Sequence, residues 1–216
     1  MKTVEMSEEN QKATTTSTDS EVADLELKIA ELTKRLNSLR MAANGREVPD
    51  YELQTLDGEI RLSQLFAGRD KLLAIHNMGH GCRYCTLWAD GINGILQHLE
   101  SVIAVVLLSK DPPETQRRFA NARGWRFRLA SHMGGAYMRE QSTNPEFDNM
   151  PGAVLYERKD GAIARKNSVV FGPGDMFCAA WSFLALAGLD EENWTPQYSY
   201  WQRPVTLDDG GKNLLE

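Results

Sequence analysis

The chain has 216 residues, of which 42% are hydrophobic, and its formal net charge is −6. This length favours one globular domain with appended segments. Because Lys and Arg are scattered and the charge balance is acidic, counterion release would add little to the binding of a phosphate backbone. We therefore expect no nucleic-acid partner.

The N-terminal residues lack the basic start and apolar run of a secretory signal, and no apolar stretch approaches the roughly 18 residues of a membrane span. A cytoplasmic protein without a membrane partner is expected. Its cysteines, Cys82, Cys85 and Cys178, are too few for a disulfide scaffold. In a reducing compartment, a close pair of cysteines indicates redox chemistry or metal binding.

Residues 1–20 are polar, acidic and poor in apolar groups, so we expect them to be disordered. Segment 21–43 is predicted to be an amphipathic helix, because its apolar side chains recur at spacings of three and four. These side chains are Val22, Leu25, Ile29, Leu32, Leu36 and Leu39. In the favoured interpretation this face packs on the protein's own domain. The alternative is a coiled coil through residues 22–39, which would make a homodimer.

The main domain is predicted over residues 48–188. It begins with two strand-like runs joined by Asp57 and Gly58, a dipeptide typical of a tight hairpin. The runs "KLLAIHNM" and "SVIAVVLLS" are continuously apolar, as expected of strands covered on both faces of a parallel sheet. Residues 83–99 between them are long enough for a helix, which predicts a β-α-β unit.

A helix is predicted over "DPPETQRRFANARG", with Asp111 as its N-cap, Pro112 at its first position and Gly124 at its end. The strand "RFRLA" follows, then an irregular stretch and a hairpin formed by "GAVLYER" and "AIARKNSVV". The apolar "DMFCAAWSFLALAG" is predicted to be a buried helix, and an aromatic-rich extension occupies residues 189–216. This order predicts an α/β fold with a mixed sheet and helices on both faces.

Cys82 and Cys85 follow the predicted strand "KLLAIH", where the next helix should begin. Unpaired backbone N–H groups and the helix dipole favour a thiolate there, so we expect a lowered pKa for Cys82 and assign it as the nucleophile. Cys85 lies about one turn later on the same face, from which its sulfur can form a disulfide with Cys82. Cys85 is the predicted resolving thiol of a thiol–disulfide exchange, which requires no organic cofactor.

The run "VPDYELQTLDGEIRLSQLFAGRDKLLAIHNMGHGCRYC" resembles the opening of the peroxiredoxin-like branch of the thioredoxin superfamily. The run "CRYCTLWADG" and the tail "NWTPQYSYWQRP" resemble an uncharacterised bacterial family of predicted dithiol–disulfide oxidoreductases. The resemblance implies a three-layer thioredoxin-like fold over residues 48–188. It also implies protein or low-molecular-weight disulfides and thiols as substrates.

Two further positions take their meaning from this resemblance. Such folds carry a cis-proline before the strand that faces the cysteines, and Pro151 matches that position, where it would shape the substrate groove. Gly79 stands where a peroxidatic motif carries Thr or Ser, three residues before the first cysteine. This difference speaks against peroxide reduction, although the choice between peroxides and disulfides as substrates stays open at this point.

Other functions are compatible with the same residues. His76, His80 and the two cysteines offer nitrogen and sulfur ligands within ten positions, so the alternative function is a metal-binding module for zinc or copper. In the redox interpretation, His80 is a candidate acid or base for thiol exchange, or else a solvated loop residue. A third hypothesis is a non-enzymatic interaction protein that is joined to its partner through the N-terminal helix.

Overall fold

The structure is a computed structural model that describes residues 2–144, 146–198 and 200. It divides into two compact units, Met1–Asn44 and Gly45–Glu216. The first unit contains one helix, α1 (Lys2–Ala42). The structure thus differs from the expectation of disorder at the N-terminus, because residues 2–20 form the first part of α1. No Gly or Pro interrupts the sequence of α1, so nothing in the chain stops the helix from continuing.

The predicted amphipathic segment, residues 21–43, is helical up to Ala42. Its six apolar side chains, from Val22 to Leu39, are between 37% and 62% exposed. The pairing of this face with a second copy of the chain stays a prediction. None of the helices in the part of the chain that the structure describes is both long and apolar enough to cross a membrane.

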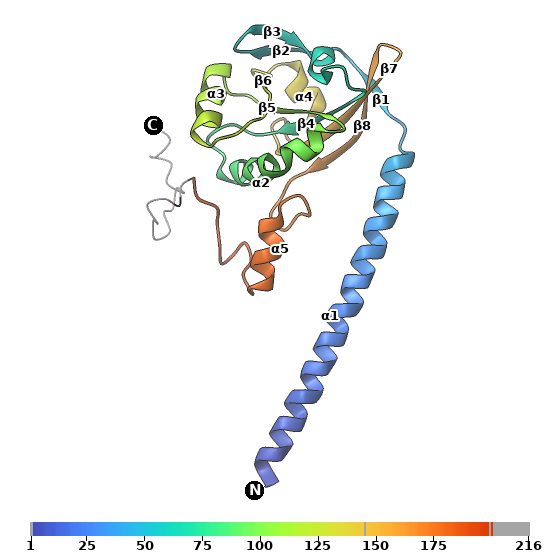
Figure 1. The fold of residues 1–216 in the computed structure, drawn as a ribbon, viewed down its shortest axis with the longest axis vertical. Helices are drawn as coiled ribbons and strands as arrows, with labels where there is room; N and C mark the ends of the chain where they lie inside the picture. The colour runs from blue at the N-terminus through green and yellow to red at the C-terminus, as the bar shows by residue number, and fades with distance from the viewer. Residues whose placement is uncertain (1, 145, 199, 201–216) are drawn as a thin grey trace. The chain divides into compact units, whose positions relative to one another are not determined.

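The second unit is built on a mixed sheet. Among its described residues, eight strands follow the order β1-β8-β7-β4-β5-β6-β2-β3. The strands are β1 (Arg46–Val48), β2 (Glu52–Thr55), β3 (Gly58–Arg61), β4 (Lys71–His76), β5 (Ala104–Ser109), β6 (Leu129–Ser131), β7 (Gly152–Lys159) and β8 (Ala162–Val170). Strand β4 lies in the middle, parallel to β5 and antiparallel to β7, as Figure 1 shows.

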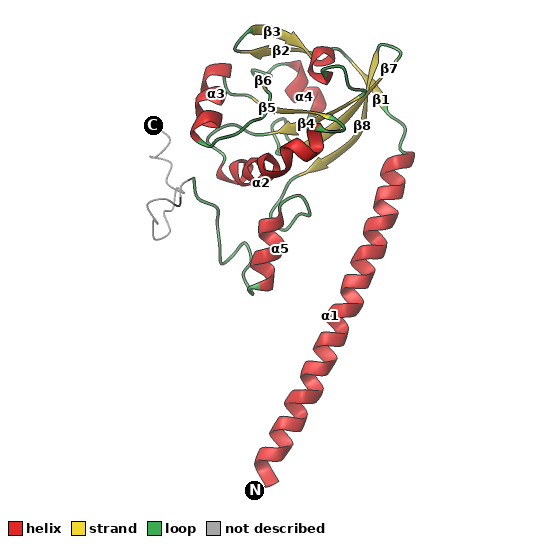
Figure 2. Ribbon diagram, in the orientation of Figure 1, coloured by secondary structure: helices red, strands yellow, loops and turns green. Residues whose placement is uncertain are grey.

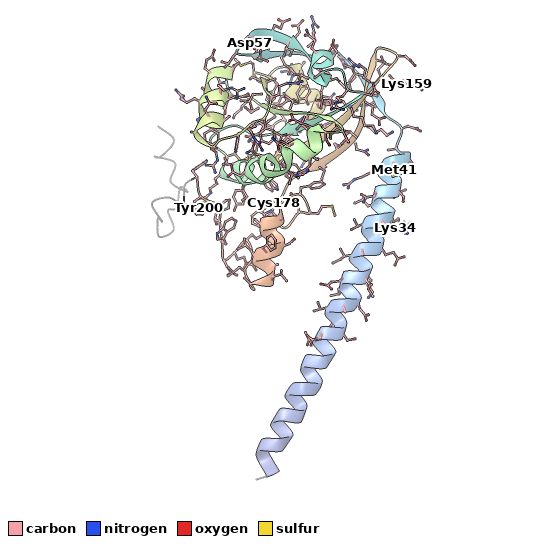
Figure 3. The ribbon with its side chains drawn as sticks, in the orientation of Figure 1. Lys34, Met41, Asp57, Lys159, Cys178 and Tyr200 are labelled. Atoms are coloured by element: carbon pink, nitrogen blue, oxygen red, sulfur yellow. A yellow bond between two sulfur atoms is a disulfide. The ribbon has the colours of Figure 1, made fainter. Side chains whose placement is uncertain are left out.

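Two hairpins frame this core. The predicted turn between β2 and β3 is confirmed: Gly58 has a φ of +107°, which a residue without Cβ adopts at little cost, and Asp57 lies at the tip (Figure 3). The second hairpin joins β7 to β8, and Lys159 marks the end of β7 in the same view. Strand β1 pairs antiparallel with β8 and extends the sheet.

Helices cover both faces of the sheet, as predicted (Figure 2). The helical elements are η1 (Leu62–Phe66), α2 (Arg83–Glu100), α3 (Pro113–Ala122), α4 (Ala136–Gln141) and α5 (Ala179–Leu186). Elements η1 and α4 pack on one face, over a core that includes Phe66 and Tyr156. Helices α2, α3 and α5 contribute to the core on the other face, which includes Trp88 and Trp181.

The prediction that the last helix is buried was wrong. In α5, Trp181 is 6% exposed and packs into the core, whereas Phe183 is 70% and Leu186 is 85% exposed. Only one side of a helix in an outer layer faces the sheet. The other sides stay exposed even when their side chains are apolar. The apolar surface that results is of the kind found at interaction sites.

Candidate active site

The two neighbouring cysteines lie where a central strand gives way to a helix. Strand β4 ends at His76, and α2 begins at Arg83 with Cys82 as its N-cap. Cys82 has an extended backbone, with φ −103° and ψ 101°, and its Sγ accepts a hydrogen bond of 3.1 Å from the backbone N–H of Cys85. A side chain at this position satisfies one of the unpaired N–H groups of the first helical turn.

Cys82 and Cys85 are joined by a disulfide, with their Cα atoms 5.3 Å apart. The two sulfurs differ in access: Cys85 is 3% exposed, while Cys82 is only partly covered. The backbone N–H of Met78 donates to Cys85 Sγ over 3.5 Å. Each sulfur therefore has a backbone N–H directed at it, which stabilises negative charge on either atom once the disulfide is reduced.

The loop between β4 and α2 is held by short contacts. The N–H of Asn77 donates to the carbonyl of Leu108 over 2.8 Å, and Asn77 Oδ1 accepts from the N–H of Gly79 over 2.8 Å. Asn149 Nδ2, from the loop before β7, donates to the carbonyl of Met78 over 3.2 Å. These contacts fix the approach of the chain to Cys82.

His80 has a partner that the sequence did not reveal. Asp111, expected to cap α3, is replaced in that role by Pro112. Its Oδ2 instead accepts from the backbone N–H of His80 over 2.6 Å and lies 3.0 Å from His80 Nδ1. Asp111 is 9% exposed, and the side chain of His80 beside it is 44% exposed. The signal that could have indicated this contact is the order of the strands. Asp111 follows β5, and β5 is parallel to β4, so the residues that follow the two strands lie at the same end of the sheet.

His76 belongs to the opposite face of the sheet. Its Nε2 lies 2.8 Å from the hydroxyl of Tyr137, and burial lowers its pKa to about 3, with the charges of His132 and Arg165 acting in the same direction. The chain of polar contacts continues through Tyr156 and Gln141 to Tyr51, whose pKa is raised to about 12, mainly by burial. His76 is thus held within a hydrogen-bonded network.

The geometry does not favour the metal-binding alternative. His76 and His80 are engaged by Tyr137 and Asp111, and the two cysteines are bonded to each other. Within residues 2–144, 146–198 and 200, no three His, Cys, Asp or Glu side chains are grouped so that they could hold a metal ion.

Pro151 is buried and lies directly before β7, whose first residue, Gly152, pairs with His76. It therefore occupies the same edge of the sheet as the loop that leads to the cysteines. The expected cis bond is absent: the peptide bond before Pro151 is trans, as are all the others in the described part of the chain. The trans form is the more stable isomer even before proline.

Sequence reasoning also missed a contact from the C-terminal extension. The hydroxyl of Tyr198 donates to the carbonyl of Gly81, the residue before Cys82. Tyr198 is 6% exposed and lies 117 positions from Gly81 in the sequence. Only the number of aromatic residues in the tail hinted that it packs against the domain.

Comparisons with known proteins agree with this architecture. The model of a family described as "Bacterial protein of unknown function (DUF899)" matches residues 4–205. A search of curated protein sequences finds no match. Among solved structures, a cysteine-to-serine mutant of peroxiredoxin Q from Xanthomonas campestris is 15% identical with a TM-score of 0.50, and the alignment covers 68% of this chain and 99% of that one.

Two further structures are similar. Another structure of the same peroxiredoxin Q is 14% identical with a TM-score of 0.50, over 67% of this chain and 95% of that one. The reduced 2-Cys peroxiredoxin of Plasmodium vivax is 19% identical with a TM-score of 0.45, over 59% of this chain and 85% of that one. At these identities, the likeness to peroxiredoxin Q shows the fold, which is thioredoxin-like as the sequence predicted.

Proposed function

The chain belongs to the DUF899 family of bacterial proteins of unknown function, and from this premise we propose that it is a dithiol–disulfide oxidoreductase. One observation carries the proposal: Cys82 and Cys85 form a disulfide at the N-terminus of α2, with one accessible and one buried sulfur. This asymmetry suits a nucleophile followed by a resolving thiol.

The reaction proceeds in two exchanges. In the reduced protein, the thiolate of Cys82 attacks one sulfur of a substrate disulfide, the substrate's S–S bond breaks, and one substrate thiolate leaves. The thiolate of Cys85 then attacks Cys82 Sγ, which forms the Cys82–Cys85 bond and releases the second substrate thiolate. Two electrons pass from the protein dithiol to the substrate, and an external dithiol must return the protein to its reduced form.

His80 is proposed as the group that exchanges protons with the departing thiols. Because its Nδ1 lies 3.0 Å from the carboxylate of Asp111, the proton is placed on Nδ1 and Nε2 is left as the proton acceptor. The backbone N–H of His80 donates to the same carboxylate, so the backbone of His80 is held in place as well as its ring. Asp111 is accordingly a positioning residue.

Pro151 is proposed to shape the groove in which the substrate disulfide lies. It supports the same edge of the sheet as the cysteine loop, and the neighbouring Asn149 bonds to Met78 in that loop. The proline ring fixes the backbone φ at this position, which keeps the start of β7 rigid beside the cysteine loop. Protein disulfides and low-molecular-weight disulfides both fit this chemistry.

The test uses 5,5′-dithiobis(2-nitrobenzoate) as a model disulfide. We expect the reduced protein to release two thionitrobenzoate ions for each Cys82–Cys85 pair and to end with the internal disulfide. Cys85→Ser should release one ion and keep one as a stable adduct on Cys82, detected by the mass of the intact protein and its peptides. An adduct on Cys178, or none at all, would overturn the proposal.

A further inference from the structure

The chain beyond α5 returns to the cysteine loop. After Leu186 it turns at Asp190, whose carbonyl accepts from the N–H of Trp194 over 3.0 Å. The ring of Trp194 then packs edge-on against Trp181, with centroids 5.7 Å apart. Figure 1 shows the last described residues of the chain beside the end of α2 that carries the cysteines. The extension is therefore in contact with the core of the domain.

The end of this segment is anchored at two places. Tyr198 donates its hydroxyl to the carbonyl of Gly81, and its own carbonyl accepts from Arg123 Nη1 over 2.7 Å. Arg123 is itself fixed by an ion pair with Asp90 of α2, and Asp90 Oδ1 also accepts from Trp125 Nε1 over 2.7 Å. Tyr198 is thus tied to the loop before Cys82 and, through Arg123, to the helix after it.

A second contact joins this region to the residues between the cysteines. Tyr84 stands between Cys82 and Cys85 in the sequence, and its ring stacks on Trp181 of α5, with centroids 6.3 Å apart and an interplanar angle of 24°. Trp181 in turn supports Trp194 of the extension. Both sides of Cys82 in the sequence are therefore braced by the C-terminal part of the chain.

We propose that segment 189–198 is a working part of the active site, in which Tyr198 is a positioning residue that holds the Gly81 carbonyl and favours negative charge on Cys82. A carbonyl oxygen is the negative end of a dipole, so a hydroxyl that donates to it reduces its repulsion of a nearby thiolate. The same bond fixes the direction of the peptide that leads into the N-cap.

This inference rests on the proposed disulfide exchange and deepens it. If Tyr198 favours the thiolate, it stabilises the reduced protein and makes the disulfide more oxidising. Removing one hydrogen bond of this kind is expected to change an equilibrium constant by roughly 3- to 10-fold. A tenfold change corresponds to about 30 mV for a two-electron couple.

The experiment compares Tyr198→Phe with Tyr200→Phe, which removes a hydroxyl two residues further along the chain. Tyr200 is 53% exposed, and its hydroxyl accepts a hydrogen bond from the backbone N–H of Gln197, within the C-terminal extension. Each full-length protein is equilibrated with glutathione buffers, and the fraction of Cys82–Cys85 disulfide is read by alkylation and mass spectrometry. The pH dependence of Cys82 alkylation is measured in parallel, and thermal unfolding reports on the fold.

We expect Tyr198→Phe to shift the glutathione equilibrium 3- to 10-fold toward the disulfide and to move Cys82 alkylation to higher pH. Tyr200→Phe should match the wild type in both. Equal values for all three proteins, or equal shifts in both variants, would overturn this inference and leave the reversible disulfide intact. A wild type with no reversible equilibrium would overturn the proposed function itself, so the two failures are distinguishable.

Discussion

Cys82 and Cys178 occupy equivalent backbone positions in two different helices. Cys82 is the N-cap of α2, with φ −103° and ψ 101°, and Cys178 is the N-cap of α5, with φ −129° and ψ 108°. Both sulfurs are therefore near the positive end of a helix dipole. The two sites nevertheless differ in almost every property that decides reactivity.

Cys178 is a free thiol that is 4% exposed and packs in the core with Trp181. Burial raises the pKa of its thiol, and the opposing effect of the backbone N–H of Ala180 is smaller. Cys82 is partly exposed and has Cys85 one turn behind it. The comparison teaches that a helix terminus alone does not make a reactive thiol, because desolvation outweighs the N–H groups when the sulfur is enclosed.

The largest expected effect comes from exchanging one sulfur at each site for oxygen. Cys82→Ser should reduce the rate of disulfide reduction by on the order of 10³-fold or more, because a serine hydroxyl is not ionised at neutral pH. Cys178→Ser should keep the rate within about twofold while losing roughly 1–2 kcal/mol of stability in its apolar site. Insulin reduction and urea unfolding measure the two quantities. A comparable loss of activity in both variants would break the comparison.

Alkylation of the reduced wild type sharpens the same contrast without mutation. At pH 7, we expect iodoacetamide to modify Cys82 on the order of 100-fold faster than Cys178, because only Cys82 combines access with stabilisation of its thiolate. The rate at Cys82 should also level off at a lower pH. Peptide mapping after short labelling times gives both rates, and similar rates at the two sites would contradict this account.

His76 and His80, which lie on the chain just before Cys82, show the same contrast between a buried and an accessible group. The pKa of His76 is lowered to about 3, so the unfolded chain takes up the proton first as the pH falls below its ordinary value of 6.5. This contribution to stability is present above pH 6.5 and is progressively lost toward pH 3.

Replacing His76 with Gln should make the loss of unfolding free energy between pH 6.5 and 5 smaller by about 2 kcal/mol. Urea unfolding at a series of pH values measures these slopes. A His76→Gln protein with the wild-type slope would show that His76 titrates normally in the folded state.

The smallest effect is expected at alkaline pH. Because the pKa of Cys178 is raised above its ordinary value of 9.0, the folded state retains a proton that the unfolded chain releases. Stability from this group is complete below that value and falls as the pH rises further. With the Cys82–Cys85 disulfide kept oxidised, urea unfolding should show that Cys178→Ala loses less unfolding free energy than the wild type between pH 8 and 10. Equal losses would indicate an unperturbed thiol.

The features that the sequence predicted well are those encoded locally. The apolar runs gave β4 and β5, the Asp57–Gly58 dipeptide gave the first hairpin, and the cysteine spacing gave the disulfide. Short elements such as α4 and β1 carry too few residues for a periodic pattern, and they were missed.

The features that the sequence did not predict depend on distant parts of the chain. Asp111 could be recognised as the partner of His80 only with the register of the parallel strands, because 31 positions separate the two residues. Tyr198 reaches Gly81 across 117 positions, and no local pattern encodes that contact. The isomer of the bond before Pro151 likewise depends on tertiary contacts rather than on the residue type.

The backbone at Gly79 restricts how this site can evolve. Its φ is +123°, and a methyl group placed there would come within 2.8 Å of Asp111 Oδ1. A hydroxylated side chain at this position is therefore strained and displaces the Asp111 carboxylate, which disturbs the contact that holds His80. The effect of a substitution at Gly79 on a mutational path toward a peroxidatic motif is thus coupled to the residue at position 111.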